Sequence, residues 1–261
     1  MNVEIKTALL ISGSGSTAEA VLEARHKGEL DGIYPVAVIA SRSDAPGLEK
    51  ARRYHVDTYV VDRKMYQTSK QFGDDLLTLL KTLGVEFVSQ NGWLPKTPDS
   101  VIEMYAGRII NQHPGPLDPG RVDFGGKGMY GSRVSAARLG YAWLSHDPNE
   151  HWTEATIHNV TQEYDKGGLI AVSRQSFSEL GRPVTVADLT TSLAQAFIEG
   201  ACDLQDSLIR REHQLVIETL RTIGATQSIP IYQRDRPLIP AVYILFVEEA
   251  KSAAIQTFPQ G

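Results

Sequence analysis

The sequence contains little cysteine, no long apolar run and no excess of basic residues. Cys202 is the only cysteine in 261 residues, so neither an internal disulfide nor a cysteine-based metal cluster can form within the chain. We expect its side chain to be buried. The longest apolar stretch, residues 238–247, contains Pro240 and is shorter than the roughly 20 residues that a bilayer crossing needs. Because the apolar residues after Lys6 predict a strand and not a secretory signal, we expect a cytoplasmic protein without a membrane partner.

Acidic and basic residues nearly balance, with a formal net charge of -5. Nucleic-acid binding requires a surplus of Lys and Arg on one face of a protein, so we expect no nucleic-acid partner. With 42% hydrophobic and 22% charged residues, the chain can bury one large core or two modest ones.

Short apolar runs alternate with amphipathic ones along the chain. The runs rich in Val, Ile and Leu predict strands covered on both faces, at residues 7–12, 35–40, 58–61, 85–90, 107–112, 154–160 and 169–172. Helical spacing of apolar residues predicts helices at residues 17–27, 47–54, 69–83 and 184–211. Strands that alternate with helices indicate βαβ units. The predicted fold is therefore α/β, an open, mostly parallel twisted sheet with helices on both faces.

Two segments do not fit this alternation. Residues 113–130 are rich in Pro and Gly, and compact domains rarely contain so long a connection without a functional reason. Residues 226–261 contain several β-branched and aromatic residues, and we expect them to add strands or a sheet edge.

A glycine-rich turn joins the first predicted strand to the first predicted helix. Its residues are Gly13, Ser14, Gly15, Ser16 and Thr17. Glycines let the backbone approach a ligand closely, and the start of the following helix offers unpaired N–H groups, so the turn suits a phosphate. No Gly-Lys-Ser/Thr sequence follows, which excludes a Walker loop.

Two other interpretations of this turn stay open. One is a purely structural turn in which Ser16 or Thr17 caps the helix. The other is a dinucleotide site, because the spacing from Gly13 to Ala18 fits the dinucleotide fingerprint, and Ser41 and Arg42 could hold a ribose 2′-phosphate.

An asparagine and a histidine lie two residues apart at the end of the fifth predicted strand. Alternation along a strand places Asn111 and His113 on one side, at the edge where open parallel sheets bind ligands. Asp165 lies in a turn between two later strands. Each residue alone has an ordinary structural explanation, such as ending a strand or forming a turn. Together, an amide donor, an imidazole and a carboxylate suit proton transfer during attack on a carbonyl carbon.

Four stretches of the sequence resemble the folate-dependent formyltransferases, in particular the phosphoribosylglycinamide formyltransferase family. They are residues 9–16, 45–51, 105–114 and 158–167, in the family's order. The resemblance implies a Rossmann-like formyltransferase fold in residues 1–225, with residues 226–261 as a C-terminal extension that can pack on the same domain. It also implies an enzyme that transfers a formyl group from 10-formyltetrahydrofolate to the amine of glycinamide ribonucleotide, or to a related phosphorylated amine, in purine biosynthesis.

The resemblance also implies roles for individual residues. Asn111, His113 and Asp165 match the family's catalytic residues, while the Gly13–Thr17 turn and Lys70 match its binding site for the acceptor's phosphate. The residues alone favour the simpler interpretation of Lys70 as an exposed helical lysine. The folate would be bound, largely through backbone groups, by Gly92, Trp93, Leu94, Pro95, Thr161, Gln162, Glu163 and Tyr164. Glu199 is a candidate for contact with the acceptor's sugar. No metal is implied, the partners are small molecules, and the chain would be a monomer or a homodimer.

The sequence departs from the family around the acceptor. Thr17 stands where many members have Asn, Pro95 where Arg is common, and the segment after His113 is longer than usual. The identity of the amine therefore stays open. Alternatives are a formyltetrahydrofolate hydrolase and an amino-sugar-nucleotide formyltransferase. Outside the family, the alternatives are an NADP-dependent oxidoreductase and a non-catalytic folate- or nucleotide-binding module.

Overall fold

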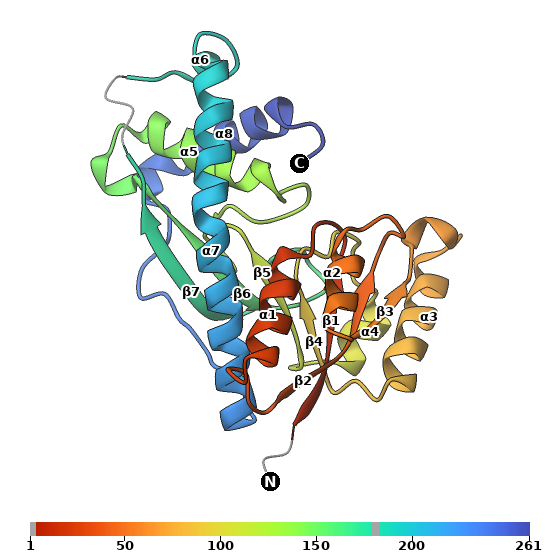
Figure 1. The fold of residues 1–261 in the computed structure, drawn as a ribbon. Coiled ribbons are helices and arrows are strands. Elements are labelled where there is room, and N and C mark those ends of the chain that lie inside the picture. Colours follow the sequence, from red (N-terminus) through yellow and green to blue (C-terminus); the bar gives the residue numbers. More distant parts are fainter. Residues whose placement is uncertain (1–3, 179–182) are drawn as a thin grey trace. The chain divides into compact units, whose positions relative to one another are not determined.

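A seven-stranded sheet runs through the chain in the order β3-β2-β1-β4-β5-β6-β7 (Figure 1). The structure is a computed structural model and describes residues 4–178 and 183–261. All seven predicted strands are present, with ends displaced by a few residues. They are β1 (Ile5–Ile11), β2 (Ile33–Ala40), β3 (Asp57–Val60), β4 (Phe87–Gln90), β5 (Ile109–His113), β6 (Trp152–Asn159) and β7 (Leu169–Ser176). The pairs β1–β2, β1–β4, β2–β3 and β4–β5 are all parallel.

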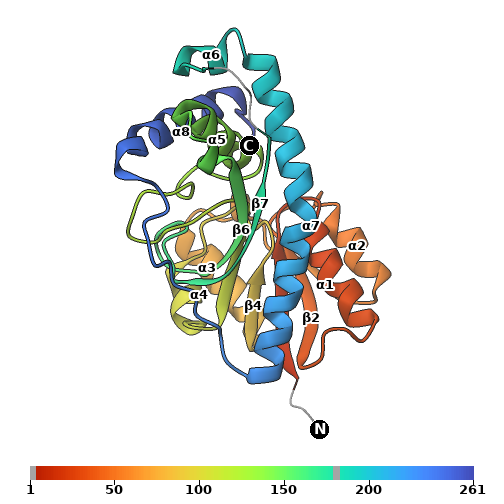
Figure 2. The same ribbon diagram turned by 90° about the vertical axis from the view of Figure 1, so that its left-hand side faces the viewer.

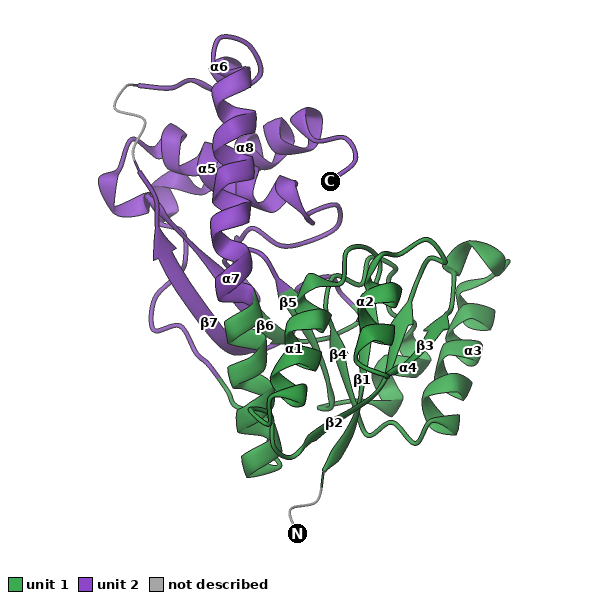
Figure 3. Cartoon of the chain, viewed as in Figure 1, with its two compact units in different colours: residues 1–112, 157–162, 213–231 green, residues 113–156, 163–212, 232–261 purple. Residues whose placement is uncertain are grey.

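The chain forms two compact units, each assembled from three separate stretches (Figure 3). Unit 1 consists of residues 1–112, 157–162 and 213–231, and unit 2 of residues 113–156, 163–212 and 232–261. Strands β5 and β6 each begin in one unit and end in the other, and so does the long helix α7 (Ala194–Thr226). The boundary expected after residue 225 stays a prediction.

Unit 1 is a parallel sheet with helices on both faces. Helices α1 (Ser16–His26) and α2 (Gly47–Arg53) cover one face, while α3 (Ser69–Thr82) and α4 (Asp99–Met104) cover the other (Figure 2). The apolar side chains of α3 that lie on one face, Phe72, Leu76 and Leu80, are buried in the same cluster as strand residues Leu10, Val88 and Ile109. A capping box between Thr68 and Gln71 fixes the start of α3.

Unit 2 is built around α5 (Ser132–Ser145), which the sequence analysis did not predict. Every residue of α5 after Ser132 is buried, so no polar face produces the periodic pattern by which a helix is recognised. Helix α6 (Val186–Thr190) and the first part of α7 occupy the tract expected to be one helix at 184–211, which is interrupted after Thr190.

The tail forms a helix, so the prediction of strands in residues 226–261 is wrong. Helix α8 (Ile244–Thr257) buries Val247, Ala250 and Ala254, which recur every three or four residues and lie in the core that also contains α5. Apolar burial at helical spacing therefore prevails over the local β-propensity. We refer to residues 232–261 as the C-terminal segment and to residues 114–131 as the glycine-rich loop.

Cys202 is exposed on α7, so the prediction of a buried cysteine is wrong; its neighbour Ala201 is the residue that this helix turns toward the core. Among the described residues, no helix combines the length and the apolar character that a membrane crossing requires.

Candidate active site

The carboxyl ends of β1, β4 and β5 lie at one edge of the sheet in unit 1. Gln90 of β4 is in register with Leu10 of β1 on one side and with Asn111 of β5 on the other. Because these strands are parallel, the turn after β1, the residues after β4 and the Asn111 side chain belong to the same edge. Ligands of open parallel sheets bind at such an edge.

The turn after β1 leaves the start of α1 open. Gly15 is the N-cap residue, at φ 64, and no side chain caps the helix, so neither Ser16 nor Thr17 is the expected cap. A Cβ on Gly15 would lie 2.7 Å from Cα of Gly47, which is why the backbone here needs glycine. Gly13 and Ser14 are exposed. The turn therefore has the uncapped N–H groups that phosphate binding requires.

Ser12 joins three loops of this edge, although sequence reasoning did not single it out. Its Oγ accepts hydrogen bonds from the Ser41 hydroxyl at 2.6 Å and from the Leu94 N–H at 2.9 Å, and its side chain is buried. Ser41 follows β2 and Leu94 follows β4. Arg42, the candidate for a ribose phosphate, instead forms two hydrogen bonds with Asp44.

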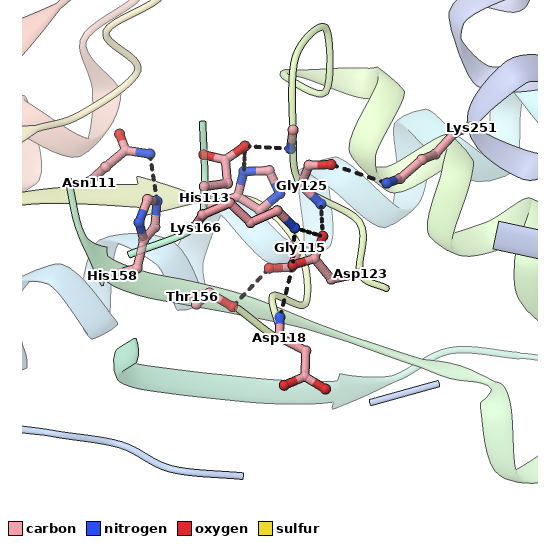
Figure 4. A network of polar contacts seen from close by, with 12 residues as sticks. Asn111, His113, Gly115, Asp118, Asp123, Gly125, Thr156, His158, Lys166 and Lys251 are labelled. Carbon is pink, nitrogen blue, oxygen red and sulfur yellow. Dashed lines mark hydrogen bonds and ion pairs between the residues drawn. The ribbon is translucent and has the colours of Figure 1, made fainter. Parts of the chain in front are cut away.

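The Asn111 carboxamide contacts a histidine that the sequence analysis missed. Nδ2 of Asn111 lies 3.1 Å from Nε2 of His158 on β6, and both residues belong to unit 1 (Figure 4). His158 fixes the orientation of the amide. It lies within one of the four recognised stretches, next to the end of β6, and a histidine close to the end of a strand of the sheet was the available signal.

His113 and Asp165 lie side by side in unit 2. Nδ1 of His113 is 3.7 Å from Oδ2 of Asp165, and both side chains are largely buried, at 3% and 11% exposure. The separation exceeds a hydrogen bond but suits an ion pair when the imidazole is protonated. The same Oδ2 accepts a hydrogen bond of 2.8 Å from the Gly126 N–H.

Two glycines of the glycine-rich loop make room for this pair. A Cβ on Gly125 would lie 2.7 Å from Cβ of Asp165 and 2.5 Å from Leu117. A Cβ on Gly115 would lie 2.3 Å from Cγ1 of Val134, whereas its distance of 3.6 Å from the imidazole of His113 would be an ordinary contact. Glycine at these positions thus allows the loop backbone to approach the pair closely.

Charged side chains also hold the glycine-rich loop near His113 and Asp165. Asp123 is buried and accepts hydrogen bonds from the backbone N–H groups of Asp118 and Gly125, and Lys166 lies 3.3 Å from both of its oxygens. Lys251 of α8 donates a hydrogen bond to the Gly125 carbonyl. Burial lowers the pKa of Lys251, and nearby carboxylates, Glu248 first among them, oppose this change.

The predicted folate-binding residues are mostly exposed, as residues that contact a ligand should be. Gly92, Leu94 and residues 161–164 are exposed, and Pro95 is half-buried. The Trp93 side chain is instead buried and stacks on Phe72, so only its backbone could face a ligand. The candidates for contact with the acceptor's phosphate and sugar, Lys70 and Glu199, each contact a residue of their own helix. Lys70 pairs with Asp74 one turn along α3, and Glu199 accepts a hydrogen bond from Gln195 on α7.

Comparisons with known proteins agree with the architecture. Residues 5–121 match the model of the formyl transferase family. The chain is 31% identical over 169 residues to the chloroplastic phosphoribosylglycinamide formyltransferase of Arabidopsis thaliana. This alignment covers 64% of this chain and 54% of that protein. It is 27% identical over 239 residues to the corresponding protein of Vigna unguiculata, with 89% and 67% covered. The aligned region thus spans about half to two thirds of the length of these relatives.

Solved structures show the same fold. Glycinamide ribonucleotide transformylase 1 from Symbiobacterium toebii superposes with a TM-score of 0.66 at 24% identity, covering 88% of this chain and 95% of that one. Phosphoribosylglycinamide formyltransferase from Coxiella burnetii superposes with a TM-score of 0.67 at 22% identity, covering 89% and 92%. The predicted Rossmann-like formyltransferase fold is confirmed. Residues 5–121 thus match the formyl transferase family, which confirms the resemblance visible in the sequence motifs.

Proposed function

We propose that this chain is a folate-dependent enzyme that transfers the formyl group of 10-formyltetrahydrofolate to the primary amine of glycinamide ribonucleotide. The observation that carries the proposal is the pairing of His113 with Asp165 at the carboxyl end of β5, at 3.7 Å. Relatives named phosphoribosylglycinamide formyltransferase support this choice of acceptor. We propose that the Gly13–Thr17 turn binds the acceptor's phosphate, since its N–H groups are uncapped.

The reaction requires an unprotonated amine, a stabilised tetrahedral oxyanion and a proton for the departing folate nitrogen. In the proposed mechanism, the Asn111 amide donates a hydrogen bond to the oxyanion. His113 carries a proton from the attacking amine to the departing folate nitrogen, because an imidazole can both accept and donate a proton. Asp165 stabilises the imidazolium through its nearby carboxylate. Once the amine has attacked the formyl carbon, the tetrahedral intermediate collapses with cleavage of its bond to the folate nitrogen, and the formyl carbon stays on the acceptor.

The proposed folate site uses backbone groups after β4 together with residues 161–164. Gly92 is exposed and adopts φ 80, a conformation that glycine reaches without strain. The Leu94 N–H already donates to the Ser12 hydroxyl. At this residue the backbone group left for a pterin is therefore the carbonyl, which could accept a hydrogen bond.

Turnover of 10-formyltetrahydrofolate with glycinamide ribonucleotide tests the proposal. Asn111→Ala and His113→Ala should each reduce kcat by at least about 10²- to 10³-fold, the usual cost of removing a group that acts in the transition state, and Asp165→Asn should be similarly damaging. The exposed residues Asn149 and His26 provide matched controls as Asn149→Ala and His26→Ala. Near-normal rates in Asn111→Ala or His113→Ala would refute the assignment, and an unaffected Asp165→Asn would leave Asp165 as a turn former.

A screen of acceptors separates the alternatives within the family. Formate release in the absence of any amine would indicate a hydrolase, and turnover with an amino-sugar nucleotide alone would replace the acceptor. Binding of a folate analogue without turnover on any amine would indicate a binding module, whereas saturable NADPH binding would support the oxidoreductase.

A further inference from the structure

The glycine-rich loop and the C-terminal segment of unit 2 are tied together by several hydrogen bonds. Arg234 donates to the carbonyl of Leu117 at 2.8 Å. The N–H of Leu238 donates to Oδ2 of Asp118, also at 2.8 Å. These contacts join residues more than a hundred positions apart, so the start of the C-terminal segment is hydrogen-bonded to the first part of the loop.

A second group of contacts ties the end of the C-terminal segment to the end of the loop. Arg133, at the start of α5, donates through Nη1 to the carbonyl of Gly128 at 3.0 Å. Through Nε and Nη2 it donates to the carbonyls of Phe258 and Pro259, both at 2.7 Å. One buried guanidinium thus holds the loop and the residues after α8 in a single arrangement.

Between these two groups, Lys251 holds the peptide bond that contacts Asp165. Nζ of Lys251 lies 3.1 Å from the carbonyl oxygen of Gly125, and the next N–H, that of Gly126, donates to Oδ2 of Asp165 at 2.8 Å. This carbonyl and this N–H belong to one peptide unit, which is planar and rigid. Fixing the carbonyl therefore fixes the direction of the N–H. A cation at the carbonyl end also polarises the peptide and strengthens the hydrogen bond at the other end.

We propose that Lys251 is a positioning residue, which orients the Gly125–Gly126 peptide so that it holds the Asp165 carboxylate beside His113. The proposal rests on the proposed function for its catalytic consequence. Its structural part concerns Gly126 and Asp165 alone and does not depend on the identity of the acceptor.

The surroundings of Lys251 suit such a role. The Lys251 side chain is 16% exposed, and its nearest carboxylate is Glu248, at 3.9 Å and 68% exposed. On the same helix Val247, Ala250 and Ala254 are buried in the core of unit 2. Gly140 of α5 leaves space for Ala250, because a Cβ there would already lie 3.4 Å from the alanine side chain. The stem of Lys251 therefore starts from a fixed backbone.

Two variants and two measurements test the proposal on the full chain. Lys251→Met keeps most of the stem but removes the donor and the charge, whereas Lys251→Arg keeps both. Lys27→Met is the matched control, because Lys27 is an exposed lysine that forms an ion pair with Glu23 on α1. The measurements are kcat and KM for both substrates, and hydrogen exchange of the Gly126 amide by NMR. If Lys251→Met fails to fold by circular dichroism, Lys251→Gln takes its place, because it removes the charge and cannot reach as far.

In Lys251→Met we expect kcat to fall about 10- to 100-fold, the usual effect of removing an orienting partner, with KM nearly unchanged. We expect Gly126 exchange to become faster, and both properties to recover in Lys251→Arg. Unchanged Gly126 exchange in Lys251→Met would overturn the proposal, as would faster exchange with unchanged kcat. If the wild type formylates no acceptor, the proposed function fails, while Gly126 exchange still decides whether Lys251 holds this peptide.

Discussion

The imidazole of His158 holds the carboxamide of Asn111, with Nε2 and Nδ2 3.1 Å apart. The other ring nitrogen, Nδ1, lies 2.8 Å from the carbonyl oxygen of Asn159. A carbonyl only accepts, so Nδ1 carries the ring proton and Nε2 accepts from Asn111. This leaves the second amide hydrogen of Asn111 to be donated elsewhere, as the proposed oxyanion requires.

Replacing His158 by leucine should impair catalysis without removing a proposed catalytic group. His158→Leu leaves the Asn111 amide present but no longer oriented. We expect kcat to fall about 10-fold, less than the 10²- to 10³-fold typical for loss of the donor itself. His26→Leu, on the surface of α1, is the control. Equal turnover by His158→Leu and the wild type would show that the Asn111–His158 contact does not matter for transfer.

Adding one methyl group at Gly125 should displace Asp165. In Gly125→Ala the new Cβ would lie 2.7 Å from Cβ of Asp165 and 2.5 Å from Leu117, so one of them must move. We expect kcat to fall about 10-fold or more, and overpacking to cost about 1–3 kcal/mol of unfolding free energy. The double variant Gly125→Ala/Asp165→Ala should be no slower than Asp165→Ala alone. Additive losses would mean that Gly125 acts through another residue.

Removing the Ser12 hydroxyl should destabilise unit 1. Ser12→Ala leaves the Ser41 hydroxyl and the Leu94 N–H without their common acceptor. We expect the free energy of unfolding to fall by about 1–3 kcal/mol, as for other unsatisfied buried donors. Ser14→Ala, in the exposed part of the same turn, should change it by less than about 0.5 kcal/mol. Urea denaturation measures both, and equal stabilities of the two variants would contradict the role of Ser12.

The stability of the chain should fall in mild acid because of His213 on α7. Burial lowers the pKa of His213 from its usual 6.5; the charge of Lys50 acts in the same direction, and that of Glu19 opposes it. The unfolded chain therefore takes up a proton first. The contribution of His213 to stability is complete above pH 6.5 and is lost as the pH falls through the lower pKa of the folded state.

Urea denaturation at pH 8 and pH 5 measures this effect. His213→Gln should show a smaller difference in unfolding free energy between the two pH values than the wild type. The control His26→Gln changes an exposed histidine of α1 and should keep the wild-type difference. An unchanged difference in His213→Gln would assign the pH dependence to other groups.

The sequence was most informative where a local pattern and the packing agree. Strands β1 and β2 are buried on both faces along most of their length, so they appear as largely apolar runs, and α3 has a clear apolar face. Helix α5 is buried on nearly all sides and shows no such face. Helix α8 is rich in apolar residues whose helical spacing becomes meaningful only once α5 is known to pack against it.

The candidate site was predictable only in part, for a related reason. His113 and Asp165 were identified from motifs, and the structure pairs them at 3.7 Å. Lys251 has no motif, because its role depends on a contact with a backbone carbonyl more than a hundred residues away. Gly125 and Gly126 were visible only as part of a glycine-rich run, and nothing in that run distinguishes a glycine required by a neighbouring side chain from one required by its own φ.

Because each unit consists of three separate stretches of the chain, neither can be obtained by cutting the protein at one place. Neither unit corresponds to a continuous stretch of the gene, so no truncation at a single point isolates one complete unit from the other. A protease that cuts one exposed peptide bond would likewise release neither. Studying the two units separately would require joining distant pieces of the chain through artificial linkers, and point substitutions in the whole polypeptide are the more direct approach.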